Sequence, residues 1–284
     1  MPAEPAAEPA AEPADLDERL DAARALIASL DSVAVAFSGG VDSTLVLALA
    51  AEVLGPRAVG VTGLSPSVAP AEAARAEALA AELGVRLVCA ATAEFDNPDY
   101  VANPPDRCFH CKTELYSVCR RVADALGMTH VLSGANADDL GDGRPGLNAA
   151  RDAGVRAPLL ECGFTKTHVR AAARRLGLPN WAKPALACLA SRLPYGTRVT
   201  PDRLAAVDRV ESQLRSMGFR EVRARHHGDE VRLEVESARV EELMRLQSDP
   251  SLLAAVRSAG FASLAVEPGG YRQGRLNDVL GPRA

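Results

Sequence analysis

The first two thirds of the chain alternate short apolar runs with longer amphipathic segments. Short apolar runs are typical of buried strands, and segments in which apolar residues recur every three or four positions are typical of helices. The expected strands cover residues 34–37, 58–63, 85–90 and 130–134, and the expected helices cover residues 16–30, 42–54, 69–83 and 114–126. This alternation predicts an α/β fold with a doubly wound parallel sheet. Because ligands of such sheets bind at the carboxyl ends of the strands, we expect the loops that follow the four strands to face one crevice.

The pattern changes near Thr200. Helical segments at 201–217, 238–246 and 251–260 are interspersed with strand-like runs at 219–226, 230–236 and 261–266. This order predicts a smaller C-terminal α+β domain. We therefore expect a disordered tail at residues 1–15, the α/β domain at residues 16–197 and the α+β domain at residues 198–284.

A Ser-Gly-Gly turn follows the first expected strand and precedes a helix. Its two glycines allow a sharp turn and a close approach to a ligand because they have no Cβ atom. The N–H groups of the turn and of the helix start then point at one spot, to which the helix dipole adds positive potential, as in phosphate sites. Asp42 is placed to hold Mg²⁺ or to orient the loop. The candidate ligands here are Ser38, Gly39, Gly40, Asp42, Ser43 and Thr44.

This loop is not a Walker A loop, because no Gly-Lys-Ser/Thr follows the glycines. The pattern Ser-Gly-Gly-Val-Asp-Ser instead resembles the PP-loop of the ATP pyrophosphatase superfamily. That resemblance implies cleavage of ATP between the α- and β-phosphates, with adenylylation of a substrate and release of pyrophosphate. The alternative is a glycine turn with a purely structural role.

A second polar loop follows the fourth expected strand. Acidic residues at the end of a strand, opposite a phosphate loop, suit Mg²⁺ or its waters. The candidates are Asn136, Asp138 and Asp139, and Arg144 is placed to steady the leaving pyrophosphate. By itself the loop is equally consistent with a solvated Asp-rich turn.

Three of the six cysteines stand in segments that suit chemistry. Cys108 and Cys111 are expected in a rigid loop before a helix, and their spacing suits a metal ion, one face of an iron–sulfur cluster or a redox dithiol. Cys188 is expected in an ordered loop, where Arg192 would favour the nucleophilic thiolate; the alternative is a small buried side chain. That alternative is the expected role of Cys89, Cys119 and Cys162.

Two arginines alternate in the C-terminal domain. Arg223 and Arg225 fall on one face of an expected strand, which makes a bidentate site for a phosphate or a carboxylate. Tyr271, Arg272 and Arg275 are candidates to join them. A solvated strand face is the alternative.

Composition narrows the classes of function. The 284 residues include 48% hydrophobic and 24% charged residues, as in ordinary globular proteins. The net charge of −5 argues against nucleic acid as a partner, and no apolar stretch approaches the roughly 20 residues of a membrane span. The repeated Ala-Glu-Pro-Ala at the start has no signal-peptide or transit-peptide pattern. We therefore expect a cytoplasmic protein with reduced thiols.

Six segments together resemble the LarE family. They are FSGGVDS, NPPDRCFHCK, GANADDLGDGRPG, KPALACLASRLPYG, GFREVRARHHGD and GYRQGRLNDVL. Members of that family are ATP-dependent sulfur transferases that make the nickel-pincer nucleotide cofactor of lactate racemase. The resemblance extends from about Leu16 to Leu280 and omits the tail.

The resemblance implies a substrate and a set of residue roles. The enzyme would adenylylate a carboxylate of pyridinium-3,5-biscarboxylic acid mononucleotide, and Cys188 would attack the activated carbon or deliver sulfur to give a thiocarboxylate. The implied residues around the nucleotide phosphate are Ser191, Arg192, Glu211, Arg223 and Arg225. The C-terminal domain would therefore bind the substrate.

The family has two sources of sulfur. In one, a single cysteine gives up its own sulfur and becomes dehydroalanine; in the other, three cysteines hold a [4Fe-4S] cluster that bears a labile sulfide. Cys108, Cys111 and Cys188 are three candidate ligands, which favours the cluster. The implied cofactors are therefore ATP, Mg²⁺ and a [4Fe-4S] cluster. The implied partners are a small-molecule nucleotide, a second copy of the chain and the other enzymes of nickel-pincer nucleotide synthesis.

Three other functions fit parts of the pattern. An amidotransferase or NAD-synthetase-like enzyme would deliver ammonia and would not need Cys188. A tRNA-thiolating enzyme would need a basic face, against which the net charge argues. A non-catalytic nucleotide-binding regulator would bind ATP without releasing pyrophosphate.

Overall fold

The computed structural model describes residues 12–140, 145–184, 187–272 and 274–280. Packing divides them into two compact units. The first unit is the described part of Met1–Gly63, Ala73–Ala90 and Lys112–Lys183, and the second is the described part of Leu64–Glu72, Ala91–Cys111 and Pro184–Ala284. The domain division at residues 197 and 198 remains a prediction from the sequence pattern.

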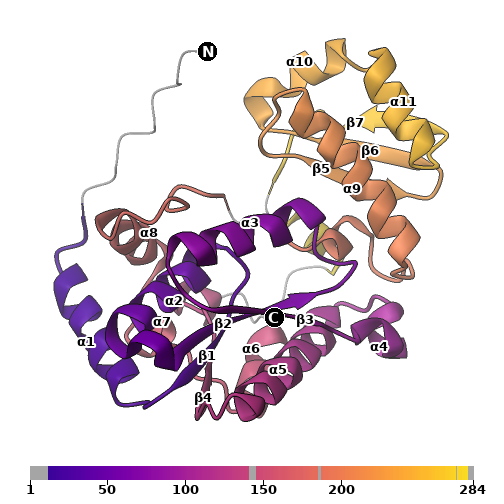
Figure 1. Cartoon of the computed structure of the whole chain (residues 1–284). Helices are drawn as coiled ribbons and strands as arrows, with labels where there is room; N and C mark the ends of the chain where they lie inside the picture. Colours follow the sequence, from indigo (N-terminus) through magenta and orange to yellow (C-terminus); the bar gives the residue numbers. More distant parts are fainter. Residues whose placement is uncertain (1–11, 141–144, 185–186, 273, 281–284) are drawn as a thin grey trace. The chain divides into compact units, whose positions relative to one another are not determined.

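The first unit is built on a four-stranded parallel sheet (Figure 1). Its strands are β1 (Val33–Ala36), β2 (Ala58–Leu64), β3 (Leu87–Ala91) and β4 (His130–Leu132), in the order β3-β2-β1-β4. In the strand register, Val33 pairs with Ala58 of β2 on one side and with His130 of β4 on the other. The chain therefore moves outward from β1 to β3 and then returns to the opposite side of β1. This reversal makes a topological switch point between β1 and β4, where open α/β sheets bind ligands.

Helices cover both faces of this sheet. The longer ones are α1 (Leu16–Ala28), α2 (Val41–Leu54), α3 (Pro70–Glu82), α5 (Arg107–Ala125) and α8 (Lys166–Arg175), and the short ones are α6 (Pro145–Asp152) and α7 (Pro158–Glu161). A further short helix, α4 (Pro98–Val101), belongs to the second unit. Apolar residues of α1, α2, α3 and α8 form the larger core with one face of the sheet. Cys119 and Ala123 of α5 pack on the other face against β1, β2 and β4. Because α2 is buried on most sides, its sequence is apolar almost all round.

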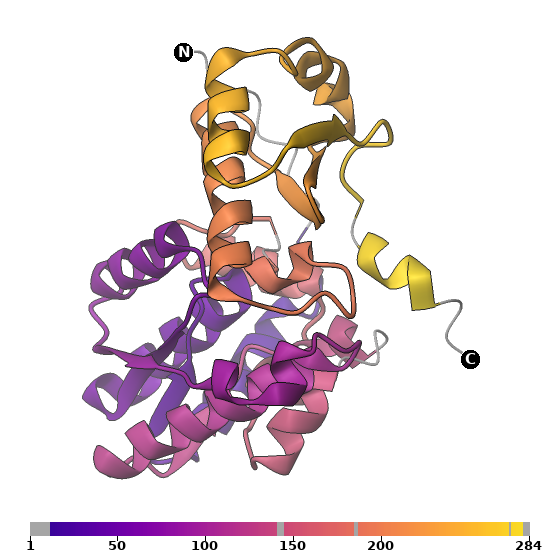
Figure 2. The same cartoon turned by 90° about the vertical axis from the view of Figure 1, so that its right-hand side faces the viewer.

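The second unit has a three-stranded sheet of its own. Its strands are β5 (Arg223–His227), β6 (Glu230–Glu234) and β7 (Ser263–Val266), and its helices are α9 (Pro201–Ser216), α10 (Val240–Arg245) and α11 (Pro250–Ser258). β6 lies in the middle, antiparallel to β5 and parallel to β7. Figure 2 shows α9, in orange, alongside this sheet. Tyr100 and Val101 of α4, distant in sequence, belong to the same apolar core.

The structure confirms the predicted parallel sheet flanked by helices and the smaller α+β element near the C-terminus. Two local expectations are wrong, and one helix was missed. The helix expected at residue 114 begins at Arg107, so Cys108 lies in its first turn and Cys111 at the start of its second, and neither is in a loop. α8 was not expected at all. Cys89 is exposed, not buried, because β3 is an edge strand of the sheet.

Among the helices in the described ranges, none combines the length and the apolarity needed to span a membrane.

Candidate active site

The glycine turn closes onto the start of α2 through a ring of short polar contacts. Gly39 has a φ of +67°, and a Cβ atom there would lie 3.2 Å from Ala76, so both the conformation and the packing favour glycine. The Ser43 hydroxyl accepts a hydrogen bond from the Ser38 N–H (3.2 Å) and donates one to the Gly40 carbonyl (3.1 Å). Thr44 also donates to the Gly40 carbonyl at 2.9 Å. The predicted loop residues therefore form one compact turn at the amino end of a helix.

The loop after β4 lies directly against this helix start. A Cβ atom on Gly134 would lie 2.7 Å from the Ser43 nitrogen, so only glycine fits there. The Asn136 amide then donates to Asp42 Oδ1 at 3.1 Å. Asp139 accepts a hydrogen bond from the Asn136 N–H at 3.0 Å. The structure thus brings the second predicted polar loop beside the first at the switch point between β1 and β4.

A lysine that the sequence pattern did not single out completes this arrangement. Lys166 is the first residue of α8, and its Nζ lies 2.5 Å from Asp42 Oδ2. Its backbone N–H donates to Asp138 Oδ2 at 2.8 Å. Thr165 fixes the start of α8 through a capping box with His168. Lys166 therefore places a cation beside the loop, which has no lysine of its own.

A further segment of the first unit contacts the same loop. The Asn180 amide donates to the Gly39 carbonyl at 3.1 Å and to the Thr44 hydroxyl at 2.9 Å. Lys183 Nζ donates to the Gly39 carbonyl at 3.3 Å. These contacts make the loop rigid and add a second cation near it. Arg144, predicted to bind the pyrophosphate, lies outside the described residues.

The three candidate cysteines all fall in the second unit. Cys188 is exposed at the start of the short 3-10 helix η4 (Leu189–Arg192), Cys108 is exposed, and Cys111 is half-buried against the apolar core. Burial lowers the pKa of Arg107, but the acidic groups of Cys188, Cys108 and two tyrosines outweigh it and leave that pKa above its ordinary value. Cys188 and Cys108 therefore lie near one buried cation.

The fit of these thiols to a metal is a separate matter. In the described ranges, no three His, Cys, Asp or Glu side chains form a group that could hold a metal ion. Cys108, Cys111 and Cys188 share a unit, but among the described residues they do not form such a group.

Cys188 is connected to a buried ion pair through its backbone. Arg192 is 2% exposed and forms a bidentate ion pair with the fully buried Glu211. Its Nε donates to Oε1 at 2.6 Å, and its Nη2 donates to Oε2 at 3.0 Å. Arg192 Nη1 also donates to the Cys188 carbonyl at 3.0 Å. Burial alone would raise the pKa of Glu211. The charges of Arg192 and Arg215 and the hydrogen bonds to the carboxylate have a larger, opposite effect, so the pKa of Glu211 lies below its ordinary value. This pair holds the start of η4 in place.

The two alternate arginines of β5 lie beside this pair. Arg225 donates to the Ser191 carbonyl at 2.8 Å and to Glu234 at 2.9 Å. Arg223 is 3% exposed, and its guanidinium lies 4.6 Å from the centre of the Tyr271 ring. Burial, together with the charges of Arg192 and Arg225, lowers the pKa of Arg223. The structure therefore groups all five residues predicted around a substrate phosphate: Ser191, Arg192, Glu211, Arg223 and Arg225.

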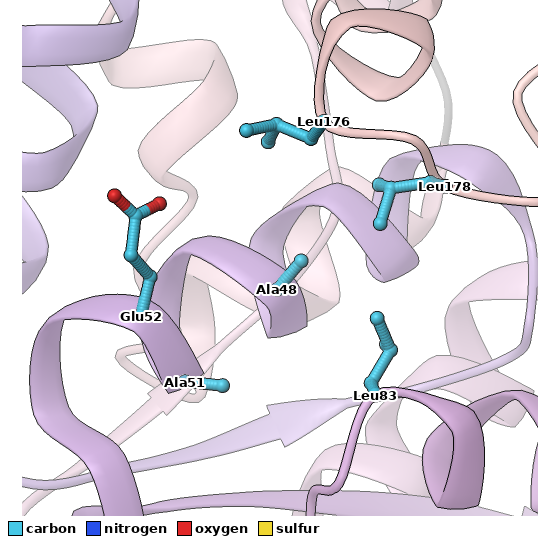
Figure 3. A pocket seen from close by; sticks show the side chains of 6 residues that line it. All are labelled: Ala48, Ala51, Glu52, Leu83, Leu176 and Leu178. Carbon is cyan, nitrogen blue, oxygen red and sulfur yellow. The ribbon is translucent and has the colours of Figure 1, made fainter.

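Two cavities among the described residues are lined by segments other than the glycine loop. One of about 380 Å³ lies in the first unit and is lined mainly by apolar side chains, with Glu52 at its edge (Figure 3). Ala48, its lining residue closest to the start of α2, is seven residues from Val41, roughly 10 Å at 1.5 Å per residue. Another cavity of about 530 Å³ lies in the second unit and is lined in part by Leu189, the residue after Cys188.

The switch-point loop, its helix and the two lysines define an ATP-using α/β domain of the PP-loop class. The family model for asparagine synthase matches residues 15–248. The chain is 41% identical over 258 residues to the pyridinium-3,5-bisthiocarboxylic acid mononucleotide synthase of Lactiplantibacillus plantarum, a match that covers 90% of this chain and 92% of that protein. It therefore belongs to the LarE family.

Two uncharacterized proteins also match. One from Synechocystis is 41% identical over 265 residues, which cover 93% of this chain and 99% of that protein. One from Methanocaldococcus jannaschii is 23% identical over 204 residues, which cover 72% of this chain and 77% of that protein.

Proposed function

We propose that this chain is an ATP-dependent sulfur transferase that converts a carboxylate of pyridinium-3,5-biscarboxylic acid mononucleotide to a thiocarboxylate. The supporting observation is that an exposed thiol, Cys188, lies four residues before Arg192 in a segment that also contacts Arg225. A nucleophile and a group of phosphate-binding cations are thus combined in one unit. The PP-loop of the first unit supplies the ATP chemistry that makes a carboxylate reactive.

The reaction divides into three steps. A substrate carboxylate oxygen attacks the α-phosphorus of ATP, the bond to the β-phosphate oxygen breaks, and pyrophosphate leaves. The Cys188 thiolate then attacks the acyl carbon, the bond to the AMP oxygen breaks, and a thioester forms. A base finally removes the Cα proton of Cys188, the Cβ–Sγ bond breaks, and the thiocarboxylate leaves while Cys188 becomes dehydroalanine. The first step replaces a poor leaving group, the carboxylate oxygen, by a good one, AMP, and thereby makes the nucleophilic second step possible.

The PP-loop and the side chains beside it act in the first step. The N–H groups at the start of α2 and the cations of Lys166 and Lys183 would face the phosphates. Mg²⁺ bound to a nucleotide needs only one or two protein carboxylates, and Asp42 and Asp138 are the ones nearest the loop contacts described above. The pair between Asp42 and Lys166 keeps both side chains at the loop.

The source of the sulfur follows from the cysteines. We propose Cys188 as the residue that meets the activated carbon, and we derive no step through a [4Fe-4S] cluster because the described thiols do not form a metal-binding group. The intact mass of the protein after one turnover separates the two sources. Loss of one sulfur from the protein indicates the sacrificial route, and an unchanged mass with repeated turnover indicates the cluster route.

The function is tested by pyrophosphate release. Protein purified without oxygen and mixed with ATP and Mg²⁺ is expected to release pyrophosphate only after the pyridinium mononucleotide is added. Mass spectrometry of the nucleotide should then show one oxygen replaced by sulfur. Pyrophosphate release that does not depend on this substrate, or a nucleotide that gains no sulfur, would contradict the proposal.

Replacing Lys166 by alanine is expected to slow pyrophosphate release by about a hundredfold, because one preorganised cation at a developing negative charge contributes on that scale. The effect should fall on the rate at saturating substrate. Arg24→Ala is the matched control, since Arg24 forms an exposed ion pair with Glu52 in the same unit. An unchanged rate in Lys166→Ala would remove this lysine from the site.

A further inference from the structure

The segment after Cys188 is tied to a distant part of the second unit by backbone hydrogen bonds. The Leu189 N–H donates to the Ser67 carbonyl at 3.0 Å. Further along, the Gly196 N–H donates to the Asn103 carbonyl (3.0 Å) and the Val199 N–H donates to the Val101 carbonyl (2.9 Å). Ser67, the end of α4 and Asn103 therefore form the base on which the Cys188 segment rests.

Asn103 lies at the centre of this base in an unusual conformation. It is fully buried and has a positive φ of +59°. Among the non-glycine residues of the described ranges, only Asp31, at +61°, also has a positive φ. Left-handed backbone at a non-glycine residue costs on the order of 1–3 kcal/mol. The Asn103 side-chain amide donates to the Pro194 carbonyl at 2.8 Å and to the Thr197 carbonyl at 2.9 Å. One side chain thus holds both ends of the Pro-Tyr-Gly turn.

Arg107 links this turn to the helix that bears the other two cysteines. It is the first residue of α5 and only 3% exposed. Its Nη1 donates to the Asn103 side-chain oxygen and, at 2.9 Å, to the Ala190 carbonyl two residues after Cys188. Cys108 follows Arg107 directly, and Cys111 lies one helical turn later. Two buried side chains therefore connect the Cys188 segment to the first turn of α5.

We propose that the pair of Asn103 and Arg107 positions Cys188 for sulfur transfer by fixing its segment against the first turn of α5. This inference rests on the proposed function. Reacting atoms must come within about 3–3.5 Å of one another, and a misplacement of about 1 Å costs roughly a hundredfold in rate. Cys188 is exposed and directly precedes a helix of one turn, so the position of its segment is set by the contacts of its neighbours. Both residues act through the backbone of the segment and are positioning residues.

The surroundings of the pair support a specific role. Asn103 and Arg107 bond to the segment within an apolar core that includes Ala190 and Leu193. Burying an amide and a guanidinium among apolar side chains is costly unless their hydrogen bonds are made. The bonds that offset this cost are directed at the carbonyls around the Pro-Tyr-Gly turn and Ala190, so they determine the path of the backbone next to Cys188.

Three variants separate the side chain from the backbone conformation. Asn103→Gly keeps the left-handed backbone but removes the amide. Asn103→Asp keeps the shape and the oxygen that faces Arg107, but turns a carboxylate oxygen toward two carbonyls. Arg107→Lys keeps the charge without the planar fork. Asp31→Gly, at the other left-handed residue and in the other unit, is the matched control.

The measurements are pyrophosphate release, sulfur transfer in a single turnover, and hydrogen exchange of the backbone amides. In both Asn103 variants we expect sulfur transfer to fall by about a hundredfold, with pyrophosphate release within about twofold of the parent chain and faster exchange at Gly196 and Val199. The rate of sulfur transfer in Arg107→Lys should lie between that of the Asn103 variants and that of the parent chain. Asp31→Gly should match the parent chain in all three measurements.

Parent-like sulfur transfer in Asn103→Gly would overturn the proposal, with or without faster exchange. Equal losses of pyrophosphate release and sulfur transfer would also overturn it, because they indicate a general effect on folding. If the parent chain itself forms no thiocarboxylate, the proposed function fails instead.

Discussion

Replacing Cys188 by alanine is expected to abolish thiocarboxylate formation while pyrophosphate release continues. The PP-loop belongs to the first unit and Cys188 to the second, and no loop contact described above involves the thiol. Adenylylation therefore does not need Cys188, whereas the attack on the activated carboxylate loses its nucleophile in this variant. The measurement is a single turnover in which pyrophosphate and the nucleotide product are followed together.

Cys89→Ala is the matched control, because Cys89 is also exposed but donates to Glu77 at 3.6 Å on the edge strand. It should retain both activities. Partial desolvation by the surrounding protein, together with Glu77, raises the pKa of Cys89, which makes its thiol a weak nucleophile. Thiocarboxylate formed by the Cys188→Ala protein at the parent rate would show that another group delivers the sulfur.

Replacing Glu211 by glutamine is expected to lower the free energy of unfolding by about 3–5 kcal/mol, since breaking a buried ion pair leaves an uncompensated charge. Glu211 is fully buried and accepts bonds from Arg192, from Arg215 and from the Ala224 N–H. Glutamine keeps the size of the side chain but removes its charge, so the buried Arg192 loses its ionic partner. Urea unfolding followed by circular dichroism measures the change.

The double variant Arg192→Met, Glu211→Leu is the informative companion. A buried pair replaced by apolar side chains is often close to neutral in stability, so this protein should unfold at a higher urea concentration than Glu211→Gln. Equal stability of Glu211→Gln and the parent chain would contradict the assignment of Glu211 as the main partner of Arg192.

The same pair sets an acid dependence. The pKa of Glu211 in the folded chain lies below its ordinary value of 4.5. The unfolded chain therefore binds more protons in this range, so the contribution of Glu211 to stability is present above that value and is lost as the pH falls below it. Between neutral pH and about pH 5 this contribution should be constant. The Glu211→Gln protein should lose stability less steeply in acid than the parent.

The parts of the fold that sequence predicted are those set by local patterns. The apolar strand before Ser38, the glycine turn and the apolar α2 form one continuous signal, and the structure has them within one residue of the expected bounds. β5 was expected at residue 219 and begins at Arg223, but the alternation that puts Arg223 and Arg225 on one face was evident. Side-chain periodicity was therefore more reliable than element ends.

The parts that sequence missed depend on contacts far apart in the chain. Lys166 and Asp42 are 124 residues apart, and no local pattern links them. The buried residues of α8 are Val169, Ala172 and Ala173, a weak apolar stripe. Its capping Thr165 was a usable signal for the helix start. At α5, the prolines at 104 and 105 indicated a loop, although proline is well tolerated where a helix begins.

The second unit draws on three stretches of the chain, and the last of them ends at the C-terminus. Phe95, Tyr100 and Val101 leave the ribosome early but pack against residues of α9 and α11 that are made much later. At 5–20 residues per second, this delay amounts to roughly 5 to 30 seconds. During that time the partners of these side chains in α9 and α11 are missing, although Phe95 and Tyr100 contact each other. The order of synthesis therefore leaves part of this core uncovered during translation, and its contacts between distant residues predict slow folding of the unit that contains Cys188.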